Sequence, residues 1–240
     1  MKLTILGTGS ATPSLERGSS SYIVTADRST VLVDIGPAVV KRLIEYGFSI
    51  EDIDVIALTH FHVDHTADLA SFLFACNYGV PPREKPLLIV GGKGIHKFYR
   101  GLKGVYPWIQ PKSYGLTVRS LPRSSIRVGG LTMKTAHVTH NPESTAFRLE
   151  AGASLVFSGD TDYSKNLARL ASTADLLVVD CSCPERKIKG HLNLALLDRL
   201  VREAKPKRVI LSHLYPDWED FRGVLHPPYL LGEDGLEVEF

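Results

Sequence analysis

The chain has 240 residues, of which 44% are hydrophobic and 22% are charged, and its formal net charge at pH 7 is +2. This composition is ordinary for a globular protein with a sizeable core. The small net charge excludes a general electrostatic attraction to nucleic acid or to an acidic membrane, but it is compatible with a local basic groove. No apolar run approaches the roughly 20 residues of a membrane-spanning helix, so we expect no membrane segment.

Cysteine usage points to a reducing environment. The chain has three cysteines, Cys76, Cys181 and Cys183. An odd, low count, together with an apolar strand that begins directly after the first two residues in place of a leader, predicts a cytoplasmic protein. The Cys-x-Cys spacing of the last two can bind a metal, but no second cysteine pair exists, so we favour thiols in the core or in a loop.

The first part of the chain alternates short apolar runs with small polar turns. Residues 3–6, 22–24 and 30–34 are predicted strands, and the polar turn between the last two is typical of a hairpin. Apolar positions at helical spacing predict a helix over 39–46, ended by a glycine. Asp34 closes the third strand, where a carboxylate can act as a simple cap.

The densest group of potential metal ligands follows a buried strand predicted over 54–58. It contains three histidines and one aspartate: His60, His62, Asp64 and His65. Because alternate residues of an extended chain point the same way, the first two histidines can share one metal ion and the other two residues can face a second. Imidazole and carboxylate suit zinc, and also manganese or iron. A helix predicted over 67–76 follows; the competing interpretation is a polar turn with solvated histidines.

The middle of the chain adds strands and one helix. An apolar strand over 87–90 leads through a glycine-rich turn into a helix over 95–102, and further strands follow. The aromatic segment 106–114 can wall a substrate pocket or simply pack against the protein. His137 and His140 come after an alternating segment, and we expect one of them to be a metal ligand.

Three further candidates lie at the ends of elements predicted in the last third of the chain. Asp160 follows the strand 154–157, His191 lies at the start of a helix ending at 204, and His213 follows the strand 209–211. A carboxylate at a strand end can lie between two cations, or it can cap a helix. The first of the two histidines can face the site or solvent. Another strand is predicted over 175–180, and an alternating edge strand over 236–240.

The pattern His60-x-His62-x-Asp64-His65 after an apolar strand resembles the signature of the metallo-β-lactamase superfamily. The resemblance implies two divalent metal ions, zinc first and manganese or iron as alternatives, held in two sets: His60, His62 and His140 for one ion, and Asp64, His65 and His213 for the other. It also implies that Asp160 bridges the ions and that Asp34 supports the metal loop. His191 matches a histidine that faces the substrate in the phosphodiesterase branches.

The same resemblance implies the fold. We expect an α+β protein with a four-layer αββα sandwich, formed by a single domain over 1–240. The strands fall into one group before about residue 120 and another over about 125–240. The halves are not independent, because both supply ligands.

The loop from Gly7 to Ser21 looks like that of the ribonuclease Z branch, with the proline, arginine and serines in place. Leu15 and Gly18 stand where that branch usually has lysine and asparagine. Ribonuclease Z also carries a long arm for transfer RNA between its third histidine ligand and the bridging aspartate, and the short stretch from His140 to Asp160 has no room for one. We therefore favour a small phosphodiester or other small ester over transfer RNA.

These features predict a metal-dependent hydrolase in which a hydroxide between two cations attacks the substrate. Asp64 would orient the nucleophile or accept its proton, and His191 would stabilise the transition state or protonate the leaving oxygen. The alternatives are a lactonase or thioester hydrolase on the same metals and a non-catalytic relative that binds a small molecule. A diiron oxygen-reducing enzyme is disfavoured, because such relatives usually have a carboxylate where His62 stands. The sequence is also compatible with a homodimer.

Overall fold

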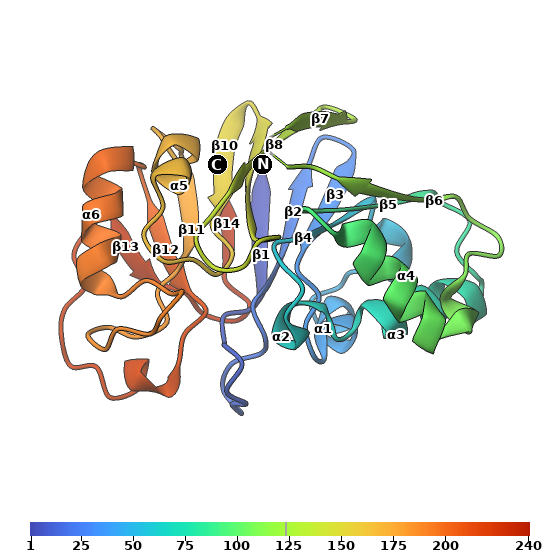
Figure 1. The fold of residues 1–240 in the computed structure, drawn as a ribbon, viewed down its shortest axis with the longest axis horizontal. Coiled ribbons are helices and arrows are strands. Elements are labelled where there is room, and N and C mark those ends of the chain that lie inside the picture. Colours follow the sequence, from blue (N-terminus) through green and yellow to red (C-terminus); the bar gives the residue numbers. More distant parts are fainter. Residues whose placement is uncertain (123) are drawn as a thin grey trace.

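Two seven-stranded sheets lie face to face in the computed structural model, with helices on both outer faces, which confirms the expected four-layer sandwich (Figure 1). The structure describes residues 1–122 and 124–240. Helices α1, α3 and α4 cover one sheet, and α5 and α6 cover the other (Figure 1).

The first sheet has the strand order β14-β1-β2-β3-β4-β5-β6. Its strands are β1 (Lys2–Gly7), β2 (Ser21–Ala26), β3 (Ser29–Val33), β4 (Val55–Leu58), β5 (Leu87–Gly91), β6 (Leu116–Ser120) and β14 (Glu237–Glu239). The helices on this side are α1 (Val39–Glu45), α2 (Val63–Thr66), α3 (Leu69–Tyr78) and α4 (Ile95–Val105), with 3₁₀ turns at Ile50–Asp52 and Pro107–Ile109.

The second sheet has the order β13-β12-β11-β10-β9-β8-β7. Its strands are β7 (Ser125–Val128), β8 (Leu131–His137), β9 (Thr145–Ala151), β10 (Ala153–Phe157), β11 (Leu176–Asp180), β12 (Val209–Ser212) and β13 (Tyr229–Leu231). Its helices are α5 (Lys165–Leu170) and α6 (Leu194–Ala204), with a 3₁₀ turn at Pro216–Trp218.

The C-terminal strand departs from the expected division into halves. β14 crosses back to the first sheet and pairs antiparallel with β1, where Leu3 lies opposite Val238. It is an edge strand, as the alternation predicted, but it belongs to the other sheet. Pairing with β1 covers the edge that the first strand of the chain would otherwise expose.

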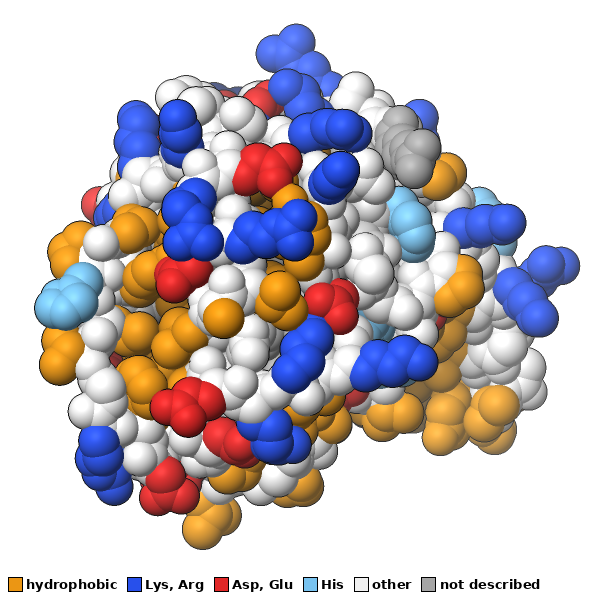
Figure 2. Space-filling model, turned by 60° about the vertical axis from the view of Figure 1, so that its left-hand side comes forward, with side chains coloured by type: hydrophobic (Ala, Val, Ile, Leu, Met, Phe, Trp, Pro, Cys, Tyr) orange, Lys and Arg blue, Asp and Glu red, His pale blue; other side chains and the backbone are white. Residues whose placement is uncertain are grey.

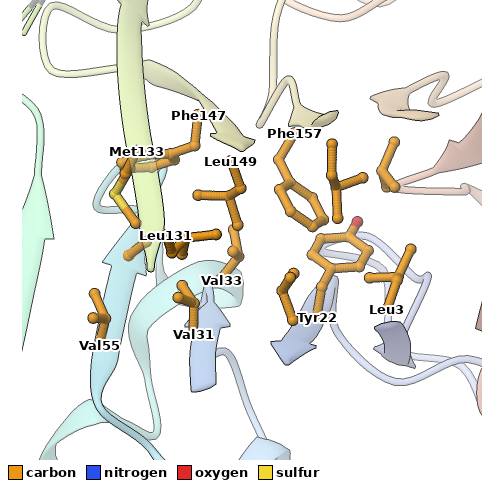
Figure 3. Packing of buried hydrophobic residues seen from close by; sticks show 14 of the residues in the cluster. Leu3, Tyr22, Val31, Val33, Val55, Leu131, Met133, Phe147, Leu149 and Phe157 are labelled. Carbon is orange, nitrogen blue, oxygen red and sulfur yellow. The ribbon is translucent and has the colours of Figure 1, made fainter. Parts of the chain in front are cut away.

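The inner core lies between the sheets and takes side chains from both. Val31 and Val33 of β3 point inward, while Leu32 between them packs with the outer helices. Figure 3 shows the inward residues of the first sheet facing Phe147 and Phe157 of the second. Each fully buried aliphatic or aromatic side chain contributes about 1.5–3 kcal/mol, so burial on both faces stabilises the central strands of the sandwich.

Two helix starts differ from the sequence prediction. The segment expected as one helix over 67–76 is preceded by the short α2, so Asp64 and His65 lie on a helical turn. The helix expected from 190 begins at Leu194, where the Asn193 side chain accepts a hydrogen bond from the Leu196 N–H. Asparagine is a strong N-cap residue, and its position here leaves His191 outside the helix.

The parallel strands place their carboxyl ends at one edge of the sandwich. β3, β4 and β5 run parallel in the first sheet, and β10, β11 and β12 run parallel in the second. This edge is the lower one in Figure 1, and α2 lies near its middle. Loops that follow these strands therefore approach one another, although they are far apart in sequence. Within residues 1–122 and 124–240, no helix combines the length and apolar character needed to cross a bilayer.

Candidate metal centre

The loop after β4 is fixed by Asp34, at the end of β3. The Asp34 carboxylate is 1% exposed and accepts hydrogen bonds from the Thr59 backbone N–H and from the Thr59 hydroxyl, both at 2.8 Å. Its Oδ2 also accepts one from His65 Nδ1, at 2.8 Å. Asp34 is therefore no simple cap, because its two oxygens tie together both ends of the histidine loop.

The first set of candidate ligands converges on one oxygen of Asp160. Asp160 Oδ2 lies 3.5 Å from His60 Nε2 and 3.9 Å from His140 Nε2. His140 Nε2 in turn lies 3.3 Å from His62 Nδ1. Three ring nitrogens from β4's loop and from the loop after β8 thus face one carboxylate oxygen from the loop after β10.

The second candidate set approaches both oxygens of the same carboxylate. His65 Nε2 is 3.3 Å from Asp160 Oδ1, and His213 Nε2 is 3.3 Å from Asp160 Oδ2. Asp64 Oδ2 lies 3.6 Å from His65 Nε2 and 3.4 Å from His213 Nε2. Asp160 is therefore within reach of both groups, as a bridging ligand would be.

These atoms fit divalent cations. His60 Nε2, His65 Nε2 and Asp160 Oδ1 are buried and have no hydrogen-bond partner among the described residues. Buried polar atoms are seldom left in that condition. Ligands at 2.0–2.2 Å around a tetrahedral zinc ion stand about 3.4 Å from one another, which is close to the separations found here. The donor set, imidazole and carboxylate, is also one that zinc prefers.

Hydrogen bonds on the far side of the histidine rings leave the nitrogens that face Asp160 free to bind a metal ion. His60 Nδ1 donates to the Thr59 hydroxyl at 3.1 Å, and His140 Nδ1 donates to the Gly190 carbonyl at 3.0 Å. His65 Nδ1 donates to Asp34 in the same way. Each bond holds the proton on Nδ1, so Nε2 keeps a lone pair that faces the centre. The Asn141 side-chain amide lies 2.9 Å from His62 Nε2, which leaves Nδ1 of that ring facing inward.

The charges of the centre also suit a cation. Burial, aided by the positive charge of His65, lowers the pKa of His60 to about 2, so its ring is neutral and can donate electrons. Burial opposes the ionisation of Asp64, but the hydrogen bond with His213 and the charge of His65 outweigh it and lower the pKa of Asp64 to about 2. Burial would lower the pKa of His65, but the negative charges of Asp160 and Asp34 raise it well above its ordinary value. The same two carboxylates would attract a cation, which must displace the proton from His65 Nε2 in order to bind there.

His191 lies beside the two ligand sets. It is 7% exposed, so the solvent-facing alternative is wrong. Its ring stacks on that of His213 with the centroids 5.1 Å apart, and its Nδ1 donates to Asp180 Oδ2 at 2.9 Å. Burial would lower the pKa of His191, but the hydrogen bond and charge of Asp180 outweigh it, and the pKa is raised.

Asp180 is the residue that sequence reasoning missed. It closes β11, as Asp34 follows β3, and it also accepts a hydrogen bond from the Thr161 backbone N–H, next to Asp160. The sequence does carry a signal, because an apolar run ends directly in aspartate at both Asp34 and Asp180. The sequence prediction uses Asp180 only as the last residue of a buried strand.

Other residues singled out by the sequence lie outside the ligand sets. His137 is at the end of β8, where its Nδ1 donates to the Ser144 carbonyl at 2.8 Å. Cys181 and Cys183 are buried free thiols, as favoured. The backbone of the aromatic segment 106–114 is held against α3, where the Asn77 amide donates to the Trp108 and Gln110 carbonyls. Of its aromatic side chains only Tyr114 is buried, whereas Tyr106 and Trp108 are exposed, so the packing alternative holds for Tyr114 alone.

The glycine loop after β1 contacts the last candidate ligand. The Leu214 N–H, directly after His213, donates to the Thr8 carbonyl at 2.8 Å, and Gly9 forms a bridge with Leu214. A Cβ on Gly9 would lie 2.9 Å from the Gly18 carbonyl oxygen. Glycine therefore permits the two sides of the first loop to approach each other at residues 9 and 18, and this loop in turn contacts the residue after His213.

Comparison with known proteins identifies the class and the family. The chain is 26% identical over 221 residues to the "Probable metallo-hydrolase YhfI" of Bacillus subtilis, covering 89% of this chain and 87% of that protein. It is 31% identical over 244 residues to a ribonuclease Z of Mycobacterium bovis, covering 90% and 86% of the two chains. The crystal structure of the metallo-β-lactamase-fold protein YhfI superimposes with a TM-score of 0.82 at 22% identity, over 99% of this chain and 98% of that one.

The fold and the histidine–aspartate clusters, together with these relatives, define a metallo-β-lactamase-fold hydrolase. A family model described as Anti-Pycsar protein Apyc1 matches residues 1–227, and the chain belongs to this family. The expected superfamily and its ribonuclease Z side are thereby confirmed.

Proposed function

We propose that the protein is a metal-dependent phosphodiesterase with a dinuclear site. The observation that carries the proposal is the position of Asp160, whose carboxylate has ring nitrogens of both candidate ligand sets within 3.9 Å. One ion is assigned to His60, His62 and His140, and the other to Asp64, His65 and His213. Zinc suits this donor set best, and manganese and iron also accept it.

Divalent cations held by these residues would lower the pKa of a bound water molecule and neutralise charge that develops on substrate oxygens. Asp64 would accept a hydrogen bond from the attacking water and thereby orient it. His191 donates a proton from Nε2 to the leaving oxygen, while Asp180 holds its Nδ1–H. The raised pKa of His191 supports this assignment, because a general acid must be protonated before the reaction.

A short connection in the second sheet and a mixed surface charge favour a small substrate. β9 and β10 are joined by a single residue, Gly152, so no arm projects between His140 and Asp160. On the face that Figure 2 shows, lysine and arginine side chains are interspersed with acidic and apolar ones. A long nucleic-acid backbone is generally bound by a continuous basic surface. These features support a small phosphodiester over transfer RNA, even though several relatives carry the name ribonuclease Z.

The test is turnover of bis(p-nitrophenyl) phosphate by zinc-loaded protein, with the bound zinc measured in the same samples. We expect turnover, about two zinc ions per chain, and a loss of activity of at least a hundredfold in Asp64→Ala. Asp220→Asn, an exposed aspartate elsewhere, serves as the matched control and should keep full activity.

Absence of turnover in the zinc-loaded protein, or turnover that Asp64→Ala leaves unchanged, would contradict the proposal. A panel that includes lactones and thioesters decides between the chemistries that the same centre can support. Hydrolysis of a lactone or thioester without hydrolysis of any phosphodiester would replace the phosphodiesterase assignment. Zinc binding with no hydrolysis of the whole panel would point to the non-catalytic alternative.

A further inference from the structure

A tyrosine next to the last candidate ligand has no role in the site as described so far. Tyr215 lies two residues after His213, and its ring centroid is 5.8 Å from that of His213 and 6.3 Å from that of His191. Its side chain is half-buried. The ring therefore forms part of the wall that carries both histidines.

The backbone holds Tyr215 in place. Its N–H donates to the Ser182 carbonyl at 2.9 Å, and Pro216 directly after it opens a 3₁₀ turn that ends at the buried Trp218. The Trp218 indole N–H donates to the Cys181 carbonyl, which closes the turn onto the end of β11. Both the ring and its backbone are thus tied to the strand ends that form the site.

The phenol hydroxyl of Tyr215 has no hydrogen-bond partner within residues 1–122 and 124–240. Three other tyrosines use theirs: Tyr22 donates to the Ser212 hydroxyl, Tyr163 to Glu203 and Tyr229 to Asp198. The Tyr114 hydroxyl also has no partner, but it is buried in the core between the first sheet and its helices. A rigidly held, partly buried donor without a protein partner, beside a cluster built for cations, is available to a ligand with anionic oxygens.

We propose that the Tyr215 hydroxyl donates a hydrogen bond to a non-bridging oxygen of the substrate phosphoryl group. The inference rests on the proposed phosphodiesterase function, since it names a second donor at the same site. His191 supplies a donor to the leaving oxygen, and Tyr215, on the same wall, supplies one to a neighbouring oxygen. In the transition state, negative charge is spread over the equatorial phosphoryl oxygens, and a preorganised donor aimed at one of them stabilises it.

The expected effect is confined to ligand binding and rate. A hydrogen bond to a charged group contributes about 1.5–3 kcal/mol, which corresponds to roughly a 10–100-fold change. Tyr215→Phe removes only the hydroxyl, and no described residue loses a hydrogen bond. We therefore expect kcat on bis(p-nitrophenyl) phosphate to fall by about that factor, with KM little changed.

The deciding measurement uses orthovanadate, a mimic of the phosphoryl transition state, with zinc-loaded wild-type protein, Tyr215→Phe and the control Tyr106→Phe. Tyr106 is 48% exposed in the segment that packs on α3. Calorimetry should show at least a tenfold weaker vanadate affinity in Tyr215→Phe alone, with the zinc content and Tm of all three proteins equal. Equal vanadate affinity in wild type and Tyr215→Phe, no binding to the wild type, or a loss of zinc in Tyr215→Phe would overturn the inference.

This binding test separates the two proposals. If wild-type protein binds vanadate in a Tyr215-dependent way but cleaves no phosphodiester, the phosphodiesterase assignment fails and the hydrogen bond from Tyr215 stands. If the wild type cleaves phosphodiesters while Tyr215→Phe binds vanadate equally well, the function stands and the role of Tyr215 fails.

Discussion

The N-terminal and C-terminal sheets supply their candidate ligands in different ways. The first sheet contributes four from one short loop after β4, whereas the second contributes His140, Asp160 and His213 from the ends of three separate strands. In the first, covalent connection keeps the ligands together. In the second, only the register of β8, β10 and β12 does so.

Each sheet nevertheless uses the same supporting device. Asp34 after β3 holds His65, and Asp180 at the end of β11 holds His191, each through a hydrogen bond from Nδ1 of the histidine. A buried carboxylate at a strand end is rigid, because the sheet fixes its backbone. The comparison teaches that a local cluster and a dispersed one can be oriented by equivalent contacts.

The largest effect is expected at Asp160, where the two ligand sets meet. Asp160→Asn keeps the shape of the side chain but removes its charge, so both ions should bind weakly and activity should fall by at least a thousandfold. Metal analysis should show fewer than two zinc ions per chain. An asparagine variant that retains two ions and near-normal turnover would show that the two sets do not share this carboxylate.

Metal binding by the four candidate ligands after β4 should depend on Asp34, which accepts a hydrogen bond from His65. Asp34→Asn should weaken zinc binding by about 10–100-fold, since partners of ligating histidines typically contribute that much. Competition with a chelator measures this affinity directly. Retention of wild-type affinity would mean that the chain connectivity of the loop, without the contacts of Asp34, holds these ligands in place.

The corresponding change on the other sheet should separate positioning from metal binding. Asp180→Asn removes none of the seven proposed ligands, and Asp180 Oδ1 lies 3.8 Å from Nδ1 of the proposed ligand His213, too far for a hydrogen bond. The substitution does weaken the hydrogen bond that orients His191, and because this bond raises the pKa of His191, that pKa should fall. We expect kcat to fall by about tenfold while zinc affinity stays within a factor of two or three. A loss of zinc as large as that of Asp34→Asn would contradict the division of labour between the two carboxylates.

The smallest effect concerns the register of the second sheet. Asp175 accepts hydrogen bonds from Ser154 and Lys207, and these lower its pKa from 3.8 to about 2. A carboxyl whose folded pKa is lowered stabilises the protein above its unfolded pKa, and this contribution is lost as the pH falls from about 4 to 2. Because the group is partly exposed, we expect Asp175→Asn to cost only about 1 kcal/mol at pH 7.

Urea unfolding of wild type and Asp175→Asn at several pH values measures this contribution. The difference between the two should shrink towards zero as the pH approaches 2. A difference that is constant over this range would show that the carboxylate charge does not help to tie β10 to β11.

Much of the architecture could be predicted from local patterns. The apolar runs marked strands in both sheets, and the spacing of His60, His62, Asp64 and His65 marked the loop, because neighbouring residues stay close in any fold. The sequence did not decide whether Asp34 simply caps the strand end or holds the histidine loop after β4. That choice depends on whether Thr59 and His65 come within hydrogen-bond distance, which no local pattern states.

The amino-acid sequence by itself determined the strands, the local cluster and, through resemblance, the superfamily. Only the tertiary structure decided that β14 joins the first sheet, that His191 lies outside its helix against Asp180, and that Tyr215 stands beside the centre. The physical reason is that these facts depend on strand pairing and on packing between residues far apart in the chain. Periodicity reports which face of an element is apolar, but not which neighbour that face will meet.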